Sequence, residues 1–475
     1  MTGFGSNLPD RNDGPDDGDP LGDLFRSMFG PGGQLPPELA NLPGVPSDPA
    51  QLQAMFAQVQ QMLAGGGDGP VNWDLAGNIA RQAAAEGGDP SVGDAQQRAV
   101  TEALRTADLW LDRVTDLAAA TGRTFAWSRA EWVEQTLPVW KGVVEPVAER
   151  VGAAMSDAMS SQAPPELAPM LGAALPMMRR MGGAFFGAQV GQAVGALSRE
   201  VVGGGDVGLP LLAAGGAALL PANIAAFGQG LGLPEDEVRL YLALREAAHA
   251  RLFAGVPWLS AHILGAVDDY ARGIAIDTER IEEAVRQIDP NDPAALQEAL
   301  SSGIFEPERT PIQQAALDRL ETALALVEGW VDEVVDAAAR TSLPHAVALR
   351  ETLRRRRAAG GPAEHTFASL VGLELRPRRL REAAAVWAAL TAARGVAGRD
   401  ALWEHPDLVP TADSFADPEG FAGAQTPTPG GQDLDAALAA ILDEADRGAH
   451  GEDTDGQGTK DEGTKDEGTD GEAKA

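Results

Sequence analysis

The chain has 475 residues, a formal net charge of −33 and no cysteine. The lack of cysteine excludes disulfide bonds and thiolate metal sites, and the strong negative charge argues against broad nucleic-acid binding. The N-terminus shows no secretory signal. The most apolar region, Met181–Phe227, never reaches 18 uninterrupted apolar residues. We therefore expect a cytoplasmic protein with no membrane or nucleic-acid partner.

Residues 1–66 are acidic and rich in glycine and proline, with few aromatic side chains, which predicts a mostly disordered region. Within it, Leu21–Phe29 carries an apolar stripe that either docks as a short helix or packs on nothing. Pro49–Ala64 is a second helical candidate. We place one folded domain at residues 67–424.

The first part of this domain shows helical patterns over residues 74–86, 91–121 and 128–163, and its tryptophans are predicted core anchors: Trp110, Trp127, Trp132 and Trp140. One or two buried helices follow at residues 169–197. Glycine recurs there at every fourth position, which would let another helix backbone approach closely: Gly183, Gly187, Gly191 and Gly195.

Short apolar runs at residues 207–212 and 217–220 predict a small hairpin or a pair of strands. The central helix runs from Leu233 to Phe253. Pro234 suits its start, three acidic residues follow in the first turn, and Gly255 and Pro257 end it.

Further helices are predicted at residues 262–272, 276–287, 293–301, 312–340, 344–358 and 377–394. Residues 425–475 form a Pro/Gly linker, a short amphipathic helix at 433–447 and an acidic low-complexity tail that we expect to be disordered. The fold class is therefore mainly α with a small β element.

The central helix contains Arg245-Glu246-Ala247-Ala248-His249, which is the H-E-x-x-H zinc signature with arginine in place of the first histidine. In an intact signature the two histidines share a helix face and bind zinc, while the glutamate activates the metal-bound water. Taken alone, the remaining E-x-x-H recurs by chance, and an amphipathic helix with a partnered histidine is then the favoured interpretation.

The chain resembles an actinobacterial zincin-like family whose members are labelled hydrolases or zinc-dependent metalloproteases. The matching segments are Gly69–Ala76, Leu219–Phe227, Leu244–Leu259, Val327–Asp336, Ala359–Trp387 and Ala401–Phe415. The resemblance implies relatives with H-E-x-x-H and E-G-H, where this chain has R-E-x-x-H and E-G-W, so Arg245 and Trp330 would fill the vacated positions.

The resemblance also implies a zincin-like arrangement of the gluzincin type, in which a second helix carries E-x-x-x-D. Glu328 and Asp332 match that pattern. Glu246 would then be the candidate general base, His249 and Glu328 the candidate metal ligands, and Asp332 the residue that orients a ligating histidine. Arginine has no free lone pair for a metal, so no cofactor is expected, and zinc is expected only if the site is functional.

Two further expectations follow from the vacated ligand position. Arg245 should form an ion pair with Glu328, because its planar fork binds a carboxylate and supplies positive charge in place of the metal. His262 is the other histidine near enough in sequence to His249 to act as a third ligand.

Nine arginines and three glutamates lie between Arg350 and Arg381. They either bind an anion or pair with this chain's own excess carboxylates, and we favour internal pairing. Three further histidines show no ligand spacing and are expected to be structural: His345, His365 and His405.

Two functions of different class remain. The first is a zinc-dependent hydrolase or peptidase with Glu246 as its base. The second, which we favour from the chemistry of position 245, is a catalytically degenerate member that serves as a binding or scaffolding protein. The sequence names no partner, and a peptide or a protein is compatible with it.

Overall fold

The computed structural model describes residues 69–162, 168–212, 215–274, 310–359, 368, 372 and 379–424. The expected disordered regions, the helices expected at 276–287, 293–301 and 433–447, and the candidates Leu21–Phe29 and Pro49–Ala64 lie outside these residues. The chain divides into a unit at Met1–Ala422, which holds all but the last residue of the elements below, and a unit at Gly423–Ala475.

Helix α3 (Trp73–Ala85) begins at Asn72, whose side-chain oxygen accepts the Leu75 N–H at 3.0 Å. Helix α4 (Asp94–Leu111) ends ten residues before the predicted end at residue 121. The Thr115 hydroxyl and the Asp116 N–H instead donate to the Asp400 carboxylate at 2.6 and 2.8 Å. A contact with the far end of the chain thus overrides local helical preference.

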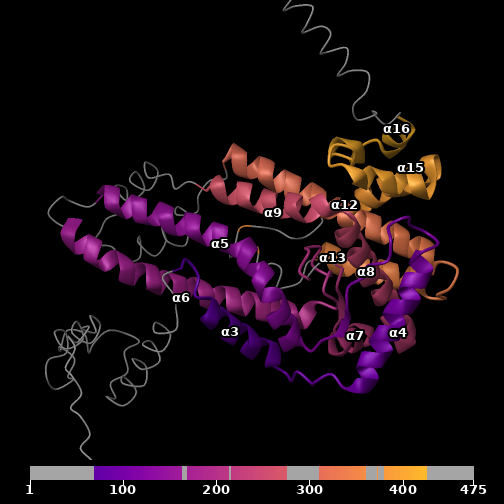
Figure 1. Ribbon diagram of the computed structural model, residues 1–475, viewed down its shortest axis with the longest axis horizontal. Helices are drawn as coiled ribbons and strands as arrows, with labels where there is room; N and C mark the ends of the chain where they lie inside the picture. The colour runs from indigo at the N-terminus through magenta and orange to yellow at the C-terminus, as the bar shows by residue number, and fades with distance from the viewer. Residues whose placement is uncertain are drawn as a thin grey trace, which may run out of the picture. The chain divides into compact units, whose positions relative to one another are not determined.

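Helices α5 (Arg129–Gln162) and α6 (Ala168–Glu200) run side by side, and α3 packs on α6 (Figure 1). The predicted close approach at the α6 glycines is confirmed. A Cβ atom at Gly187 or Gly191 would lie 2.5 Å from the carbonyl oxygen of Asn72 or Ala76, respectively. The backbone that approaches α6 is therefore that of α3 and its N-cap.

Strands β1 (Thr124–Ala126) and β2 (Ala217–Leu219) form a two-stranded parallel sheet with Phe125 opposite Ala218. The predicted pairing of residues 207–212 with 217–220 is wrong. Residues 207–212 are irregular, with a turn and bends, because Gly208 adopts φ +80° and Pro210 has no N–H for a ladder. The strand partner of β2 comes instead from the segment after α4.

Helix α7 (Pro221–Gly228) follows β2, and α8 (Glu235–Gly255) is the predicted central helix. Helix α8 contacts α4, α7, α9, α12, α13 and β2. Three acidic residues occupy its first turn, and Pro257 starts α9 (Pro257–Arg272) directly after it. Among the described helices, no single one is long and apolar enough to cross a membrane, although the pair α8 and α9, bent by 92°, would be by length and composition.

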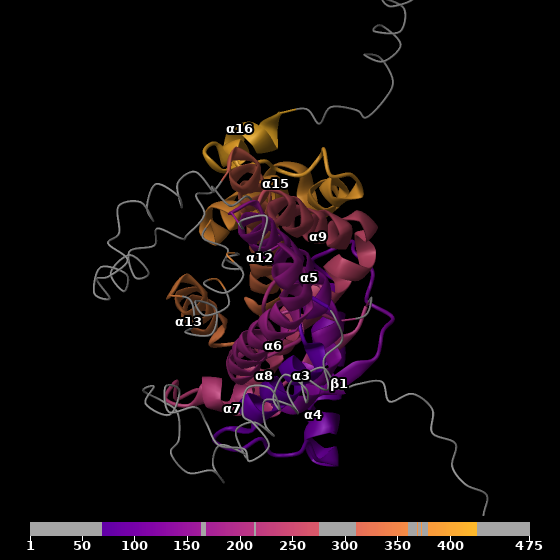
Figure 2. The same ribbon diagram turned by 90° about the vertical axis from the view of Figure 1, so that its left-hand side faces the viewer.

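Helix α12 (Pro311–Ala339) begins with a capping box in which the side chains of Thr310 and Gln313 accept each other's backbone N–H. Helix α13 (Ala346–Ala359) contacts α12, and Figure 2 shows it to the left of that helix. The described chain ends with α15 (Leu380–Asp400), two short 3-10 helices at Ala401–Glu404 and Asp413–Phe415, and α16 (Pro418–Gly423).

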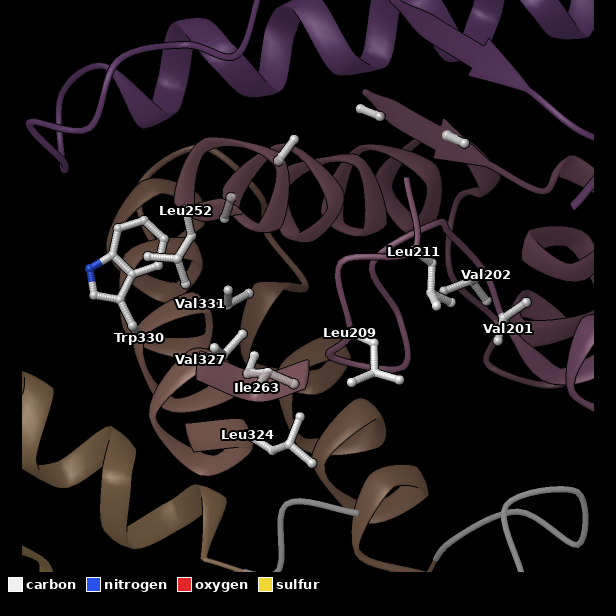
Figure 3. Close-up of a cluster of buried hydrophobic side chains, with 14 of the residues drawn as sticks. Val201, Val202, Leu209, Leu211, Leu252, Ile263, Leu324, Val327, Trp330 and Val331 are labelled. Atoms are coloured by element: carbon white, nitrogen blue, oxygen red, sulfur yellow. The ribbon is translucent and has the colours of Figure 1, made fainter. Parts of the chain in front are cut away.

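The core is one continuous apolar cluster in which α8, α9 and α12 meet the segment before β2 (Figure 3). Trp127, Trp132 and Trp140 are buried as predicted, and Trp110 packs against the cluster from a partly buried position. The predicted class, mainly α with a small β element, is confirmed.

Candidate metal-type site on helices α8, α12 and α13

Three side chains of the R-E-x-x-H motif are buried in the middle of α8. Arg245, Glu246 and His249 have exposed fractions of 4, 4 and 2%. An ionised group at such depth is costly unless it is paired or hydrogen-bonded, so their partners decide what the site can do.

The predicted ion pair between α8 and α12 is present. Arg245 Nη2 donates to Glu328 Oε2 at 2.6 Å, and Glu328 is fully buried. His249 Nε2 lies 3.0 Å from Glu328 Oε1, while His249 Nδ1 lies 2.9 Å from the Arg245 carbonyl oxygen. Both ring nitrogens of His249 therefore already face oxygen atoms of the protein.

A second arginine, which the sequence did not single out, reaches the same carboxylate. This residue is Arg357 of α13. Its Nη2 atom lies 3.0 Å from Glu328 Oε1 and 3.2 Å from Asp206 Oδ1. Burial alone would raise the pKa of Glu328, but Arg357, His249 and Arg245 together hold it well below its usual range. Glu328 is thus a buried, ionised carboxylate surrounded by cationic donors.

Glu246 is bound by backbone amides rather than by side chains. Its Oε2 accepts the Gly205 N–H and its Oε1 accepts the Ala218 N–H, both at 2.9 Å. Burial raises the pKa of Glu246, and these two hydrogen bonds oppose that effect only in part. The carboxylate expected to act as a base therefore ties β2 to the glycine segment Gly203–Gly205.

That glycine segment also occupies the free edge of β2. Gly204 N–H donates to the Ala218 carbonyl, and Leu220 N–H donates to the Val202 carbonyl, both at 3.0 Å. With β1 on the other edge and Glu246 on the Ala218 N–H, the strand has no edge left for an added strand. An extended peptide therefore has no free edge of β2 on which to add as a further strand.

Asp332 does not orient His249. Its carboxylate accepts hydrogen bonds from Arg350 Nη2 and Arg354 Nη2, both at 2.5 Å. Asp332 lies one helical turn beyond Glu328, on the face of α12 that α13 covers. Its carboxylate is therefore bound by arginines of α13 and not by His249.

Trp330 does not fill the vacated site. Residues two apart on a helix are rotated by about 200°, so Trp330 faces away from Glu328. Its Nε1 donates to Asp400 Oδ1 at 2.9 Å, and Figure 3 shows it beside Leu252, away from Leu209 and Leu211.

His262 does not reach the site either. Its ring packs edge-on against Trp258 at 5.6 Å between ring centres, in a separate hollow that also contains Trp403. Of the other two described histidines, His345 pairs with Glu237 at 3.0 Å and His405 lies 3.4 Å from Asp407. His365 lies outside the described residues.

The described arginines of the Arg350–Arg381 cluster bind groups of this chain: Arg350, Arg354, Arg355, Arg356, Arg357, Arg379 and Arg381. Their acceptors include Asp332, Glu351 and the Glu200 carbonyl. Internal pairing, the reading favoured from the sequence, accounts for these residues.

A cavity of about 420 Å³ opens beside the motif. Glu246 and His249 contribute to its wall, and the remaining lining is mostly apolar and comes from α5, α8, α9 and the segment before β2: Val139, Leu209, Leu211, Leu212, Phe253 and Leu264. A largely apolar hollow with two polar groups is typical of a ligand-binding site.

The model of the zincin-like metallopeptidase family matches residues 71–422. This chain belongs to the zincin-like metallopeptidase family. The zincin-like chain is also similar in fold to a crystal structure from Chloroflexus aurantiacus, described as a presumed hydrolase with a novel fold. That similarity has a TM-score of 0.53 at 20% identity and covers 74% of this chain and 97% of the other. No curated protein matches the chain.

The zincin family implies zinc, but the residues at this site do not fit it. A catalytic zinc normally takes three protein ligands, and the guanidinium at position 245 has no lone pair to donate to a metal. Glu328 is engaged by Arg245 and Arg357, and His249 Nε2 is directed at Glu328. Within the described ranges, no group of three or more His, Cys, Asp or Glu side chains is placed to hold a metal ion.

Sequence reasoning missed Arg357 and the amide partners of Glu246. Arg357 is one of four consecutive arginines, Arg354–Arg357. Which of them points at the site cannot be decided until the register of α13 on α12 is known. The contiguous Gly203-Gly204-Gly205 was a usable signal, because a Cβ at Gly203 would lie 2.6 Å from Glu246 Oε2 and one at Gly205 2.8 Å from His249 Cβ.

Proposed function

We propose that this chain is a catalytically degenerate zincin-like protein that uses the family fold to bind a peptide or protein segment. The observation that carries the proposal is the buried ion pair between Arg245 and Glu328 at 2.6 Å, which places a permanent cation at a ligand position. Catalysis through a zinc-bound water needs an open metal position, and this arrangement offers none.

Two further observations support the loss of hydrolysis. Glu246 accepts one backbone hydrogen bond on each carboxylate oxygen, which favours a structural role for it in this proposal. The outer edge of β2 is bonded to residues 202–204. The cavity lined by Glu246 and His249 is retained, and it supplies the binding surface in this proposal.

Hydrolysis is tested with the purified full chain and a mixture of unrelated peptides, with added zinc and with a chelator. We expect no chelator-sensitive cleavage. Chelator-sensitive cleavage that disappears in Glu246→Gln would contradict the proposal and establish the alternative, an active zinc hydrolase with Glu246 as its base.

Binding is tested with two glycines of α5 whose added Cβ would meet nothing within 4 Å. Gly142 lines the cavity, whereas Gly152 lies on the same helix and is not part of the cavity lining. Peptides that bind the unmodified chain in fluorescence anisotropy should lose affinity at least about tenfold with Gly142→Trp and keep it with Gly152→Trp. Equal affinity in both variants would show that the cavity is not the binding site.

A further inference from the structure

Acidic residues form a regular stripe along α12 that extends the E-x-x-x-D pattern by one turn. Glu328, Asp332 and Asp336 recur at every fourth position and are all buried. Side chains at such spacing lie on one helix face, one above the other. Three buried carboxylates in a row repel one another unless each has a counter-charge close by.

Helix α13 supplies a basic stripe in the opposite order. Arg350 lies 2.8 Å from Asp336 and 2.5 Å from Asp332, Arg354 lies 2.5 Å from Asp332, and Arg357 lies 3.0 Å from Glu328. These arginines occupy positions i, i+4 and i+7, so they share one face of α13. The two stripes run antiparallel and together form a ladder of ion pairs. Arg357, the last arginine of this ladder, lies at the metal-type site.

The charges at the end of the ladder balance. Glu328 and Asp206 carry two negative charges, and Arg245 and Arg357 carry two positive charges within 3.2 Å of them. A divalent cation would bring the same positive charge to the same carboxylates. Arg357 also bridges α12 to the segment before β2 through Asp206.

We infer that Arg357 is the second half of a built-in cation: Arg245 from α8 and Arg357 from α13 together replace the divalent metal that the family fold implies. The inference rests on the proposed function, since it takes the site to be metal-free in the native protein. If it holds, the arginine at position 245 is not the only residue that prevents a metal ion from binding at this site. Restoring histidine there leaves Arg357 on the Glu328 carboxylate, where its charge repels a metal ion.

Zinc uptake by full-length variants tests this inference, with zinc chloride as the probe and bound zinc counted by elemental analysis after gel filtration. We expect Arg245→His alone to stay nearly zinc-free. Arg245→His with Arg357→Met should take up about one zinc per chain, and adding His249→Ala should abolish that uptake. The matched control combines Arg245→His with Arg355→Met, because Arg355 lies on the same helix, is 76% exposed and pairs with Glu351 instead. This control should stay as zinc-free as Arg245→His alone.

Three results would overturn the inference: equal zinc uptake by Arg245→His alone, equal uptake by the Arg355→Met control, or no uptake by a folded Arg245→His/Arg357→Met chain. Circular dichroism checks that each variant is folded. If the double variant is unfolded, a crystal structure of the unmodified chain decides, since the inference requires both guanidinium groups within hydrogen-bonding distance of Glu328. Zinc bound to the unmodified chain would instead contradict the proposed function, so the two failures are distinguishable.

Discussion

Arg245 is a guanidinium placed in the middle of a buried helix, and its energetic effect depends on what surrounds it. A buried ion pair adds little net stability compared with apolar residues of similar size, because both charges lose their hydration. Removing one partner is different, because the other charge is left buried without compensation. Replacing one partner of the Arg245–Glu328 pair should therefore destabilise the protein more than replacing both.

We expect Arg245→Met to lower the free energy of unfolding by about 3 kcal/mol, near the lower end of the range for breaking a buried pair, because Arg357 still reaches Glu328. Urea denaturation measures this loss. Adding Glu328→Met should recover at least half of it, since the buried carboxylate that lost one of its two arginine partners is then gone.

The control for this experiment is Arg239→Met on the same helix. Arg239 pairs with the exposed Glu235 at 3.5 Å, so its loss should be within about 0.5 kcal/mol. A loss at Arg245 no larger than that at Arg239, or no recovery in the double variant, would show that the pair does not carry the stated energy.

At the residue scale, the sequence predicted those contacts that follow from charge and helical spacing. Arg245, His249 and Glu328 meet because i and i+4 share a face and a buried carboxylate needs a cation. The partners of Asp332 were not predictable in this way, since they depend on how α13 is placed. That Trp330 faces away from Glu328 was predictable, because two residues along a helix is more than half a turn.

At the scale of elements, α6 shows how glycine sets the distance between helices. A Cβ at Gly187 would lie 2.5 Å from the Asn72 carbonyl oxygen, a backbone atom that can move only with its helix. At Gly182, on the same helix, an added Cβ meets nothing within 4 Å.

Gly187→Ala should therefore destabilise the protein by about 1–3 kcal/mol through overpacking. Gly182→Ala should be neutral or stabilise by up to about 1 kcal/mol, because alanine favours a helix over glycine. Thermal unfolding of the two variants gives the comparison. If both lower the melting temperature equally, helix propensity and not the α3–α6 contact explains the effect.

Helices were predicted well where start and stop signals were present, as for α8 between its acidic first turn and Pro257. The sheet was predicted less well. Its strands are three residues each and lie about ninety residues apart in the chain, so neither periodicity nor a turn signal links them. The end of α4 was missed because Thr115 and Asp116 bind Asp400, a partner that no local pattern announces.

At the scale of the whole molecule, the buried apolar core of the described chain extends from Val71 to Ala422. A chain trimmed to residues 67–447 should therefore melt within about 2 °C of the full chain, since residues outside this range lack a sustained apolar pattern. A clearly lower melting temperature of the trimmed chain would mean that Leu21–Phe29 packs on the domain.

The family and the site give different information about the molecule. The fold and family follow from a match over residues 71–422, whereas hydrolysis depends on a few atoms at one place. In the function we propose, this chain lacks those atoms: Arg245 pairs with Glu328, Glu246 accepts two backbone amides, and residues 202–204 bind the edge of β2. Family membership and hydrolytic activity therefore depend on different parts of the molecule.

The most direct test of this account is the zinc content of the unmodified full-length protein, purified without chelator and measured by elemental analysis against His249→Ala. We predict well under about 0.1 zinc per chain in both proteins, because Arg245 cannot act as a ligand and Glu328 is already engaged. About one zinc per chain in the unmodified protein, lost in His249→Ala, would contradict the account and identify a working metal site.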